Sequence, residues 1–488
     1  MISLHQYKKI CEATDKILDA VPDSDEIVSI PMLHVIREHP EYLKPYNFLF
    51  GKGKPKPYKT ENLYKKLSVL IRSVFFDYKI RQLPDSLFKK SRKLIIVSHI
   101  TNPNQCNNIT DEYFGNLHTD LLGFSDIKPV ILLINHTSLS SFTLSKKLQV
   151  SKVDRIVIPK SSGLVNEFKV FFRLVSSIHY LTKRVKINNP ISSMIIKAMS
   201  SPRVFLSGMS ALRIGFFIEK IVRISNAEYL ITTYEGHSRE RIIFSSARKA
   251  NKNISCYAYQ HSIFSKYQHA LTRNIQKKYN PNHIFCCGNI TRDVLNGYSS
   301  LNGVGISVLG SPKGFPIILP KARIKNKNPT FLFLPQGIES EYRIFFNFLL
   351  ECSNAFPGFK FRWRSHPLLD LMELDFFKNK SLPSNITISS YSFDDDVIAS
   401  DVAIYRGTTA IIRASIGGLV PMYLKNEEEV EIDIMFGLKI DRISSISDIR
   451  FVIDNSFIDR GDIVKFCQNY FQPMNYKSIM DVIDKNGF

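Results

Sequence analysis

Short apolar runs alternate with polar loops and helical patterns from residue 93 onward. Each run has the length of a strand, and apolar residues recur at helical spacing after the loop that follows it. Strands that alternate with helices in this way predict a parallel sheet covered by helices on both faces. The runs of the first series occupy 94–99, 129–136, 155–159, 229–236, 255–261, 283–288 and 306–312.

A second series of the same kind follows a stretch at 312–329 that is rich in proline and lysine and predicts a linker. Its helices are expected over 342–352 and 409–416, and its apolar runs occupy 330–337, 359–367, 385–390, 401–407 and 420–424. The two series predict an α/β protein with two doubly wound, Rossmann-like domains that face a cleft. We expect the domains to divide as 1–318 and 319–488, and amphipathic segments such as 63–76 predict a helical region before about residue 90.

The charge of the chain narrows the classes of partner. Lysine and arginine number 65 against 44 aspartate and glutamate, which gives a net charge of +21, but the basic residues are dispersed, with small clusters at 89–93 and 321–327. A nucleic-acid-binding protein usually concentrates them among aromatic residues, so we expect no nucleic-acid partner. A dispersed basic surface favours an anionic membrane face or phosphorylated substrates.

No run of about 18 apolar residues predicts a spanning helix, and the N-terminus lacks the apolar core of a signal peptide. The seven cysteines form no regular framework, and the adjacent Cys286 and Cys287 lie in an apolar run that predicts buried thiols. These features predict a cytoplasmic protein, at the inner face of the cell membrane if it docks there.

Polar residues that end the strands of a doubly wound sheet are the candidates for ligand binding. In the second series, RWRSHP at 362–367 places Arg364 and His366 at a strand end, and Pro367 disfavours a helix at His366. Such a histidine can donate hydrogen bonds to a phosphate or a sugar, although a loop histidine is more often a plain surface residue.

Two further loops of the second series suit phosphate binding. YRGTTAIIRA at 405–414 predicts a turn at Gly407, with Thr408 and Thr409 opening a helix whose free N–H groups favour a diphosphate. Ordinary capping by either threonine is the alternative, and the two roles are compatible. Gln336 and Gly337 follow the first strand of this series, where a loop can contact the donor phosphates.

In the first series, TYEGHSRER at 233–241 places Glu235, His237 and Glu240 after a strand. Each could take a proton from an acceptor hydroxyl, and Glu235 is favoured because a glycine follows it and leaves the approach open. A salt bridge from Glu235 to Arg239 or Arg241 is the alternative. His261, in the loop YQHS, is expected to face the cleft from the same domain.

Taken in order, Glu235-Gly236, His366-Pro367 and Thr408-Thr409 resemble the motifs of GT-B fold glycosyltransferases of bacterial surface-carbohydrate synthesis. The resemblance is to the sialyltransferases and Kdo transferases that use CMP-activated sugars. It implies an N-terminal acceptor-side domain with Glu235 as general base, and a C-terminal donor domain in which His366 and the threonine pair hold the CMP phosphate. The implied acceptor is a surface polysaccharide or a lipid-linked glycan.

The sequence departs from this pattern in two places. Arg413 stands where many such enzymes have a glutamate for the ribose, and Glu235 is a single acidic residue where the sialyltransferases have two. No metal site or cofactor is expected, because the aspartates at 394–396 precede a helical pattern and suit its N-terminus. The alternatives are a CDP-alcohol phosphotransferase of the teichoic-acid polymerase type and a non-catalytic subunit of a polysaccharide assembly complex.

Overall fold

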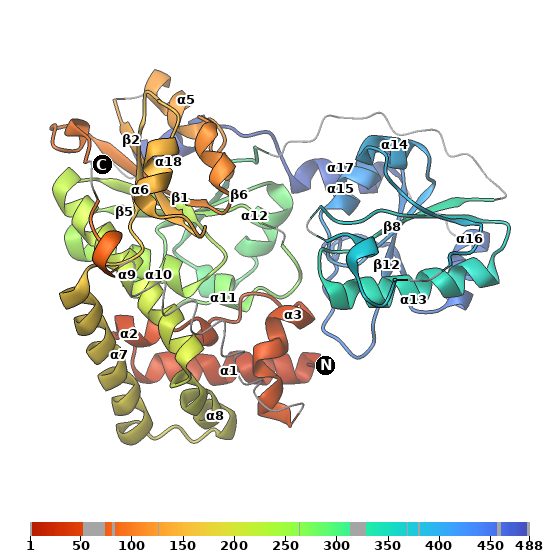
Figure 1. Ribbon diagram of the computed structural model, residues 1–488, viewed down its shortest axis with the longest axis horizontal. Coiled ribbons are helices and arrows are strands. Elements are labelled where there is room, and N and C mark those ends of the chain that lie inside the picture. The colour runs from red at the N-terminus through yellow and green to blue at the C-terminus, as the bar shows by residue number, and fades with distance from the viewer. Residues whose placement is uncertain are drawn as a thin grey trace. The chain divides into compact units, whose positions relative to one another are not determined.

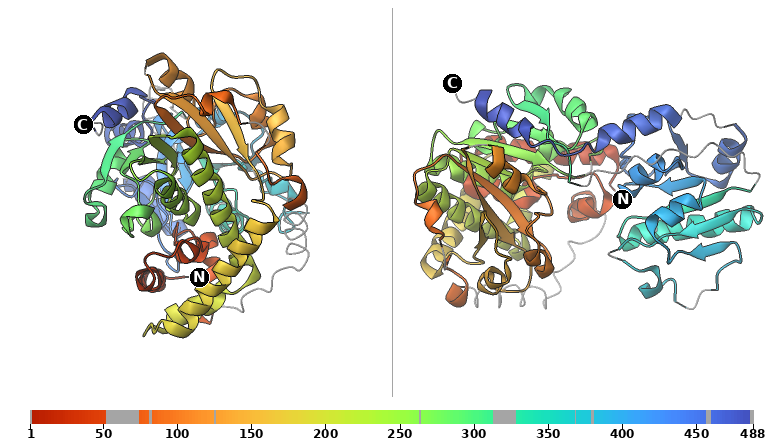
Figure 2. Two further views of the ribbon diagram at one scale, coloured as in Figure 1. Left: turned by 90° about the vertical axis from the view of Figure 1, so that its left-hand side faces the viewer. Right: turned by 90° about the horizontal axis from the view of Figure 1, so that it is seen from above.

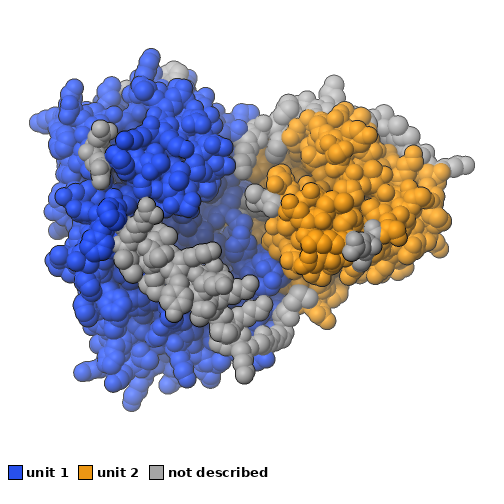
Figure 3. Space-filling view, viewed as in Figure 1, with its two compact units in different colours: residues 1–262, 268–313, 472–488 blue, residues 263–267, 314–471 orange. Residues whose placement is uncertain are grey.

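The structure is a computed structural model that describes residues 2–51, 74–80, 83–124, 126–262, 264–312, 328–367, 369–378, 381–455 and 460–485. The chain divides into two compact units, coloured blue and orange in Figure 3. The first comprises Met1–Ser262, Gln268–Lys313 and Gln472–Phe488, and the second comprises Ile263–Tyr267 and Gly314–Phe471. Most of the predicted linker at 312–329 and of the predicted helix at 63–76 lies outside the described residues.

The first unit is built on a parallel sheet with the strand order β3-β2-β1-β4-β5-β6-β7 (Figure 1). Strand β1, an inner strand of this sheet, is buried along its whole length, as the apolar run predicts, and Ile96 of β1 pairs with Ile131 of β2 and Ile231 of β4. The strands are β1 (Lys93–Ile100), β2 (Lys128–Asn135), β3 (Asp154–Ile158), β4 (Tyr229–Thr233), β5 (Ser255–Gln260), β6 (His283–Cys286) and β7 (Gly305–Val308).

Helices connect these strands, and the helical N-terminal region is confirmed (Figures 1 and 2). Three consecutive helices between β3 and β4, α7 to α9, were not expected; Pro190 and Pro202 begin two of them, and Asn226 ends the third in a left-handed conformation with φ 48°. The helices are α1 (Leu4–Ala20), α2 (Asp25–Val28), α3 (Pro40–Leu43), α5 (Leu117–Phe124), α6 (Ser141–Lys147), α7 (Leu164–Arg184), α8 (Pro190–Met199), α9 (Pro202–Ser225), α10 (Ser238–Ala250), α11 (His269–Thr272), α12 (Asn289–Asn296) and α18 (Lys477–Lys485).

The second unit has a parallel sheet in the order β10-β9-β8-β11-β12-β13, so both predicted doubly wound sheets are confirmed. Only β13 was not anticipated as an apolar run. The strands are β8 (Thr330–Leu334), β9 (Lys360–Trp363), β10 (Ile386–Ile388), β11 (Val402–Tyr405), β12 (Val420–Leu424) and β13 (Asp441–Ile443), and the helices are α13 (Glu339–Ala355), α14 (Phe393–Ile398), α15 (Ala410–Ile416), α16 (Ile446–Asn455) and α17 (Arg460–Tyr470).

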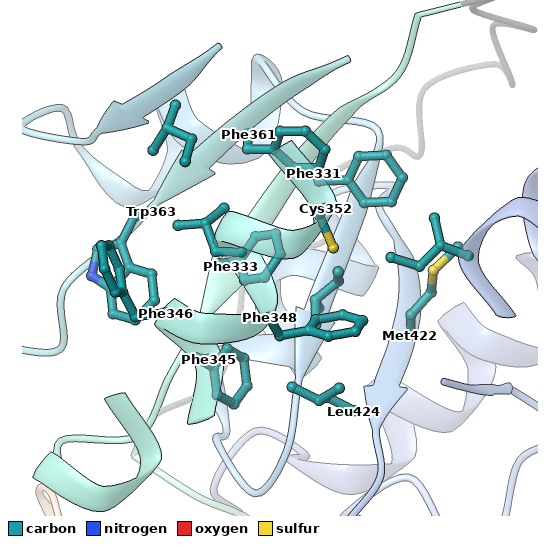
Figure 4. Packing of buried hydrophobic residues seen from close by; sticks show 14 of the residues in the cluster. Phe331, Phe333, Phe345, Phe346, Phe348, Cys352, Phe361, Trp363, Met422 and Leu424 are labelled. Atoms are coloured by element: carbon teal, nitrogen blue, oxygen red, sulfur yellow. The ribbon is translucent and has the colours of Figure 1, made fainter. Parts of the chain in front are cut away.

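Aromatic side chains dominate the core between the second sheet and α13 (Figure 4). Trp363, the only tryptophan of the chain, is fully buried and lies edge-on to Tyr342 of α13 with ring centroids 5.1 Å apart. Phe333 and Phe361 come from neighbouring strands and make a similar edge-on contact. Large rings buried together in this way fix the helix against the strands whose ends carry the candidate donor residues.

The predicted buried thiols are confirmed, because all seven cysteines are buried and form no disulfide. Among the described residues, no helix is both long and apolar enough to cross a lipid bilayer.

Candidate active site

The first sheet reverses its winding direction between β1 and β4. The chain runs outward from β1 through β2 to β3, then returns to the other side of β1 to form β4. In doubly wound sheets, ligands bind at the carboxyl ends of the two strands that flank such a switch point. Here those ends carry His99 and Thr233, and His136 follows the adjacent β2.

These three residues form a hydrogen-bonded chain. His99 Nε2 lies 2.8 Å from Thr233 Oγ1, and His99 Nδ1 lies 3.0 Å from His136 Nε2. Burial lowers the pKa of His99 well below its ordinary value, and the charge of Arg239 lowers it further. A neutral His99 has one donor and one acceptor nitrogen, which suits its contacts with the threonine hydroxyl and the second histidine.

The pH dependence of stability follows from His99. The pKa of His99 in the folded chain lies well below the value of about 6.5 for an unfolded histidine. Between these two values, the His99 side chain takes up a proton in the unfolded chain but not in the folded one. The free energy of unfolding should therefore fall as the pH is lowered from about 7 to 5. Chemical denaturation of His99→Gln should show a flatter dependence, and an unchanged slope would contradict this role for His99.

Glu235 stands just beyond β4, next to this chain of contacts. Its carboxylate forms an ion pair with Arg37, and its Oε2 lies 3.1 Å from His237 Nε2. Burial alone would raise the pKa of Glu235, but Arg37 and His237 hold it well below its usual range. Glu235 is therefore in an ion pair, but its cation is Arg37 of the N-terminal region and not Arg239 or Arg241, the partners considered from the sequence.

Glu240, a second candidate base, has a structural role. One of its carboxylate oxygens, Oε2, accepts hydrogen bonds at 2.9 Å from the backbone N–H groups of Glu235, Gly236 and His237. Burial raises the pKa of Glu240. This carboxylate holds the loop in shape beneath Glu235.

The structure gives a steric reason for glycine at position 236. Its φ is +83°, and a Cβ at this position would lie 2.3 Å from the backbone of Ala270. The glycine therefore permits a left-handed turn and a close backbone contact, both of which a larger residue would disturb.

Aromatic and basic side chains complete the cluster in this unit. The ring of Tyr113 lies edge-on to His99 and to His261, with centroids 5.4 Å and 5.0 Å away. Nε of Arg239 is buried and has no hydrogen-bond partner among the described residues. His261 therefore joins the group around the switch point, in the unit where it was expected.

The second sheet reverses its winding between β8 and β11, and three predicted segments meet there. A Cβ on Gly337 would lie 2.5 Å from His366 Nδ1, and a Cβ on Gly407 would lie 2.1 Å from Gln336 Nε2. The imidazole and the amide thus pack directly over glycine backbone. Any larger residue at 337 or 407 would displace the side chain that covers it.

The backbone of His366 is fixed by a hydrogen bond to Tyr342. Its N–H donates to Tyr342 Oη at 2.6 Å, and that hydroxyl donates to the carbonyl of Leu369 at 2.6 Å. Partial burial lowers the pKa of His366. Tyr342 of α13 thereby fixes the loop that carries His366 and the exposed Pro367.

The two threonines after β11 differ in role. Thr408 is buried, and its Oγ1 accepts a hydrogen bond at 3.3 Å from the N–H of Ala410. Thr409 is the residue that precedes α15, but its side chain makes no capping hydrogen bond. The expected capping role therefore belongs to Thr408.

Arg364 is directed toward α14. Its Nη1 lies 2.6 Å from Asp396 Oδ2 and donates at 2.8 Å to the carbonyl of Tyr391, and Arg362 shares the same carboxylate at 3.0 Å. Asp394 pairs likewise with Arg413 at 2.6 Å. The aspartates expected at the start of this helix are there, and they anchor arginines from the neighbouring strand and helix.

A buried charge cluster lies beside the Gly407 turn and was not foreseen. Arg406, 1% exposed, pairs through Nη1 with Glu341 at 3.0 Å and through Nη2 with Glu429.

Arg37, His99 and His136 were also missed as site residues. The two histidines could have been found from the sequence, because each ends a predicted apolar run, and so could Arg406, which lies in the run at 401–407. Nothing local marked Arg37. Among the described residues, no group of three or more histidine, cysteine or acidic side chains is placed to hold a metal ion.

No known protein family matches the chain, and no curated protein matches it in sequence. Solved structures are similar to it at low identity. The glycotransferase of kitacinnamycin is 12% identical with a TM-score of 0.45, over 81% of this chain and 100% of that one. The calicheamicin glycosyltransferase CalG4 is 10% identical with a TM-score of 0.45, over 82% and 98%. UDP-GlcNAc 2-epimerase from Neisseria meningitidis is 11% identical with a TM-score of 0.41, over 80% and 100%.

Proposed function

We propose that this chain is a glycosyltransferase that transfers a sugar from a nucleotide donor. The observation that carries the proposal is the convergence of Gln336, Gly337, His366 and Gly407 at the β8/β11 switch point. A histidine and an amide stand together there as hydrogen-bond donors for a phosphate. Doubly wound sheets bind nucleotides at this place.

In this proposal the second unit is the donor side. Gln336, Gly337, Gly407, Thr408 and Thr409 surround the donor phosphate, and His366 donates a hydrogen bond to it as the leaving group departs. Hydrogen-bond donors aimed at a developing negative charge are an effective way to stabilise it.

The donor we favour is a CMP-sugar, of the CMP-Kdo or CMP-sialic acid class. Arg413, at the position where a carboxylate would receive the ribose hydroxyls, pairs with Asp394 and presents no acceptor. Arg364 is bound to Asp396, so we expect its contribution to the donor phosphate to be electrostatic at most.

The first unit is the acceptor side, and Glu235 takes the proton of the attacking hydroxyl. Its two carboxylate oxygens are oriented by Arg37 and His237, which leaves lone pairs for a hydroxyl donor. The low pKa makes Glu235 a weak base, so the proposed transfer is concerted with departure of the nucleotide. The acceptor we propose is a bacterial surface polysaccharide or lipid-linked glycan at the cytoplasmic face of the membrane.

The test is a thermal-shift titration with CMP, CDP, UDP, GDP and ADP. A ligand that binds only the folded chain raises its melting temperature, and we expect CMP to give the largest rise. His366→Ala should weaken CMP binding about tenfold, the effect of one charge-assisted hydrogen bond of about 1.4 kcal/mol, and Gly407→Val should abolish it by displacing Gln336. Met372→Ala, at an exposed position near the same loop, is the matched control.

The other outcomes separate the alternatives. Preference for UDP would replace the CMP donor, and assays for sugar transfer and for epimerisation of the UDP-sugar would then distinguish those two reactions. Release of CMP from a CDP-alcohol would identify a phosphotransferase. A chain that responds to no nucleotide would contradict the proposal and favour a non-catalytic subunit.

A further inference from the structure

One apolar face of helix α7 packs against the protein, and a second apolar face is largely exposed. Leu174, Ile178 and Leu181 are buried on one side, where α7 contacts α9 and α8. Figure 1 shows α7 at the outer edge of its unit. On the other side, within about a third of the helix circumference, the exposed apolar residues are Leu164, Val165, Phe168, Phe171, Phe172 and Val175.

These exposed side chains form one continuous patch. Phe172 is 63% exposed and contacts Phe168 and Phe171, with ring centroids 6.4 Å and 5.4 Å away. Phe171 in turn contacts Phe205 of α9 at 5.2 Å. Single exposed apolar residues are common, but a contiguous aromatic patch marks a surface that binds something.

The surroundings of this patch are positively charged. The only acidic residue in 164–200 is Glu167, which is buried and pairs with Arg213 at 2.6 Å. Arg173 forms an ion pair with Glu26. The exposed basic residues that follow or flank the patch are Lys169, Lys183, Arg184, Lys186 and Lys197.

We propose that this face of α7 docks on a lipid bilayer whose headgroups are anionic. The phenylalanines enter the boundary between headgroups and acyl chains, and the lysines and arginines contact lipid phosphates. The positive charge around the patch favours an anionic bilayer over a second copy of the chain, because two copies would bring two basic surfaces together. The inference goes beyond the proposed transfer reaction, since it needs no nucleotide and stands or falls without it.

The experiment is co-sedimentation of the full chain with vesicles, without nucleotide. We expect binding to vesicles of mixed phosphatidylglycerol and phosphatidylcholine, and much weaker binding to phosphatidylcholine alone. Phe172→Ser should weaken binding to the anionic vesicles about tenfold, because the side chain loses its apolar contact with the bilayer. Phe88→Ser, at a ring 62% exposed and remote in sequence from α7, is the matched control and should bind as the wild type does.

Charge is tested separately with Lys183→Ser combined with Arg184→Ser. Each basic residue near an anionic surface contributes about 1 kcal/mol, which is roughly a fivefold change in binding for each. Circular dichroism of each variant should match that of the wild type, because the substitutions are at exposed positions.

Several outcomes would overturn the proposal. Wild-type protein that binds neither kind of vesicle, or that binds both equally, excludes an anionic bilayer as the occupant. If Phe88→Ser and Phe172→Ser weaken vesicle binding equally, α7 is not the surface that docks on the bilayer. Self-association that Phe172→Ser abolishes, in the absence of vesicle binding, would show that a second copy covers this face.

Discussion

Replacing Arg406 with methionine should lower the free energy of unfolding of the second unit by about 3–5 kcal/mol. Arg406 is buried between Glu341 and Glu429, each of which is 2% exposed in its side chain. Methionine fills much of the same volume but leaves two carboxylates buried without a cation, and an uncompensated buried charge is strongly unfavourable.

The measurement is urea denaturation followed by the fluorescence of Trp363. This tryptophan is the only one in the chain and is buried in the second unit, so it reports on that unit alone. Arg413→Met is the matched control, because the ion pair of Arg413 with Asp394 is partly exposed and should contribute about 1 kcal/mol or less. A loss for Arg406→Met no larger than for the control would contradict the prediction.

A second set of variants separates charge from packing. Adding Glu341→Gln and Glu429→Gln to Arg406→Met should recover part of the stability, because a neutral amide is easier to bury than a carboxylate. If the triple variant is no more stable than the single one, the loss comes from packing around the guanidinium.

The strands could be predicted from the sequence because a parallel sheet covered on both sides buries whole runs of residues. The run at 420–424 coincides with β12, whereas the run predicted at 229–236 ends early, since the backbone turns into the loop before Gly236. Helix was expected between β3 and β4, but its division into α7, α8 and α9 was not, because all three fall inside this single crossover. An apolar period does not show whether one helix or three fill such a crossover.

Local patterns in the sequence do not predict the order of strands in a sheet or the partner of a charged side chain. Thr408 and His366 could be placed at strand ends, because the sequence shows where apolar runs stop. The partner of Glu235 could not be found in this way, since Arg37 is 198 residues away in the chain. Glu235 was therefore predicted as a base without its partner Arg37, and the fold gives it this cation, which lowers its pKa.

Glu235→Gln should lower the rate of sugar transfer by about 10²–10⁴-fold, the contribution of a positioned general base. Glutamine keeps the size of the side chain and can still contact Arg37 or His237, but it cannot accept the proton of the acceptor hydroxyl. Glu228→Gln is the matched control, because Glu228 directly precedes the same strand at its other end and pairs with Arg92 outside the site. Similar losses for both variants, or full activity in Glu235→Gln, would remove Glu235 from the mechanism.

The pH dependence distinguishes a base from a structural carboxylate. In the wild type, the pKa of Glu235 is held well below its usual range, so the fall of kcat/KM at acid pH should begin well below about pH 4.5. Arg37→Met removes the cation that lowers this pKa, while burial, which raises it, remains. The acid limb of the profile should therefore move to higher pH in Arg37→Met. If Glu235 only supports the loop, Arg37→Met would reduce activity equally at every pH and leave the limb in place.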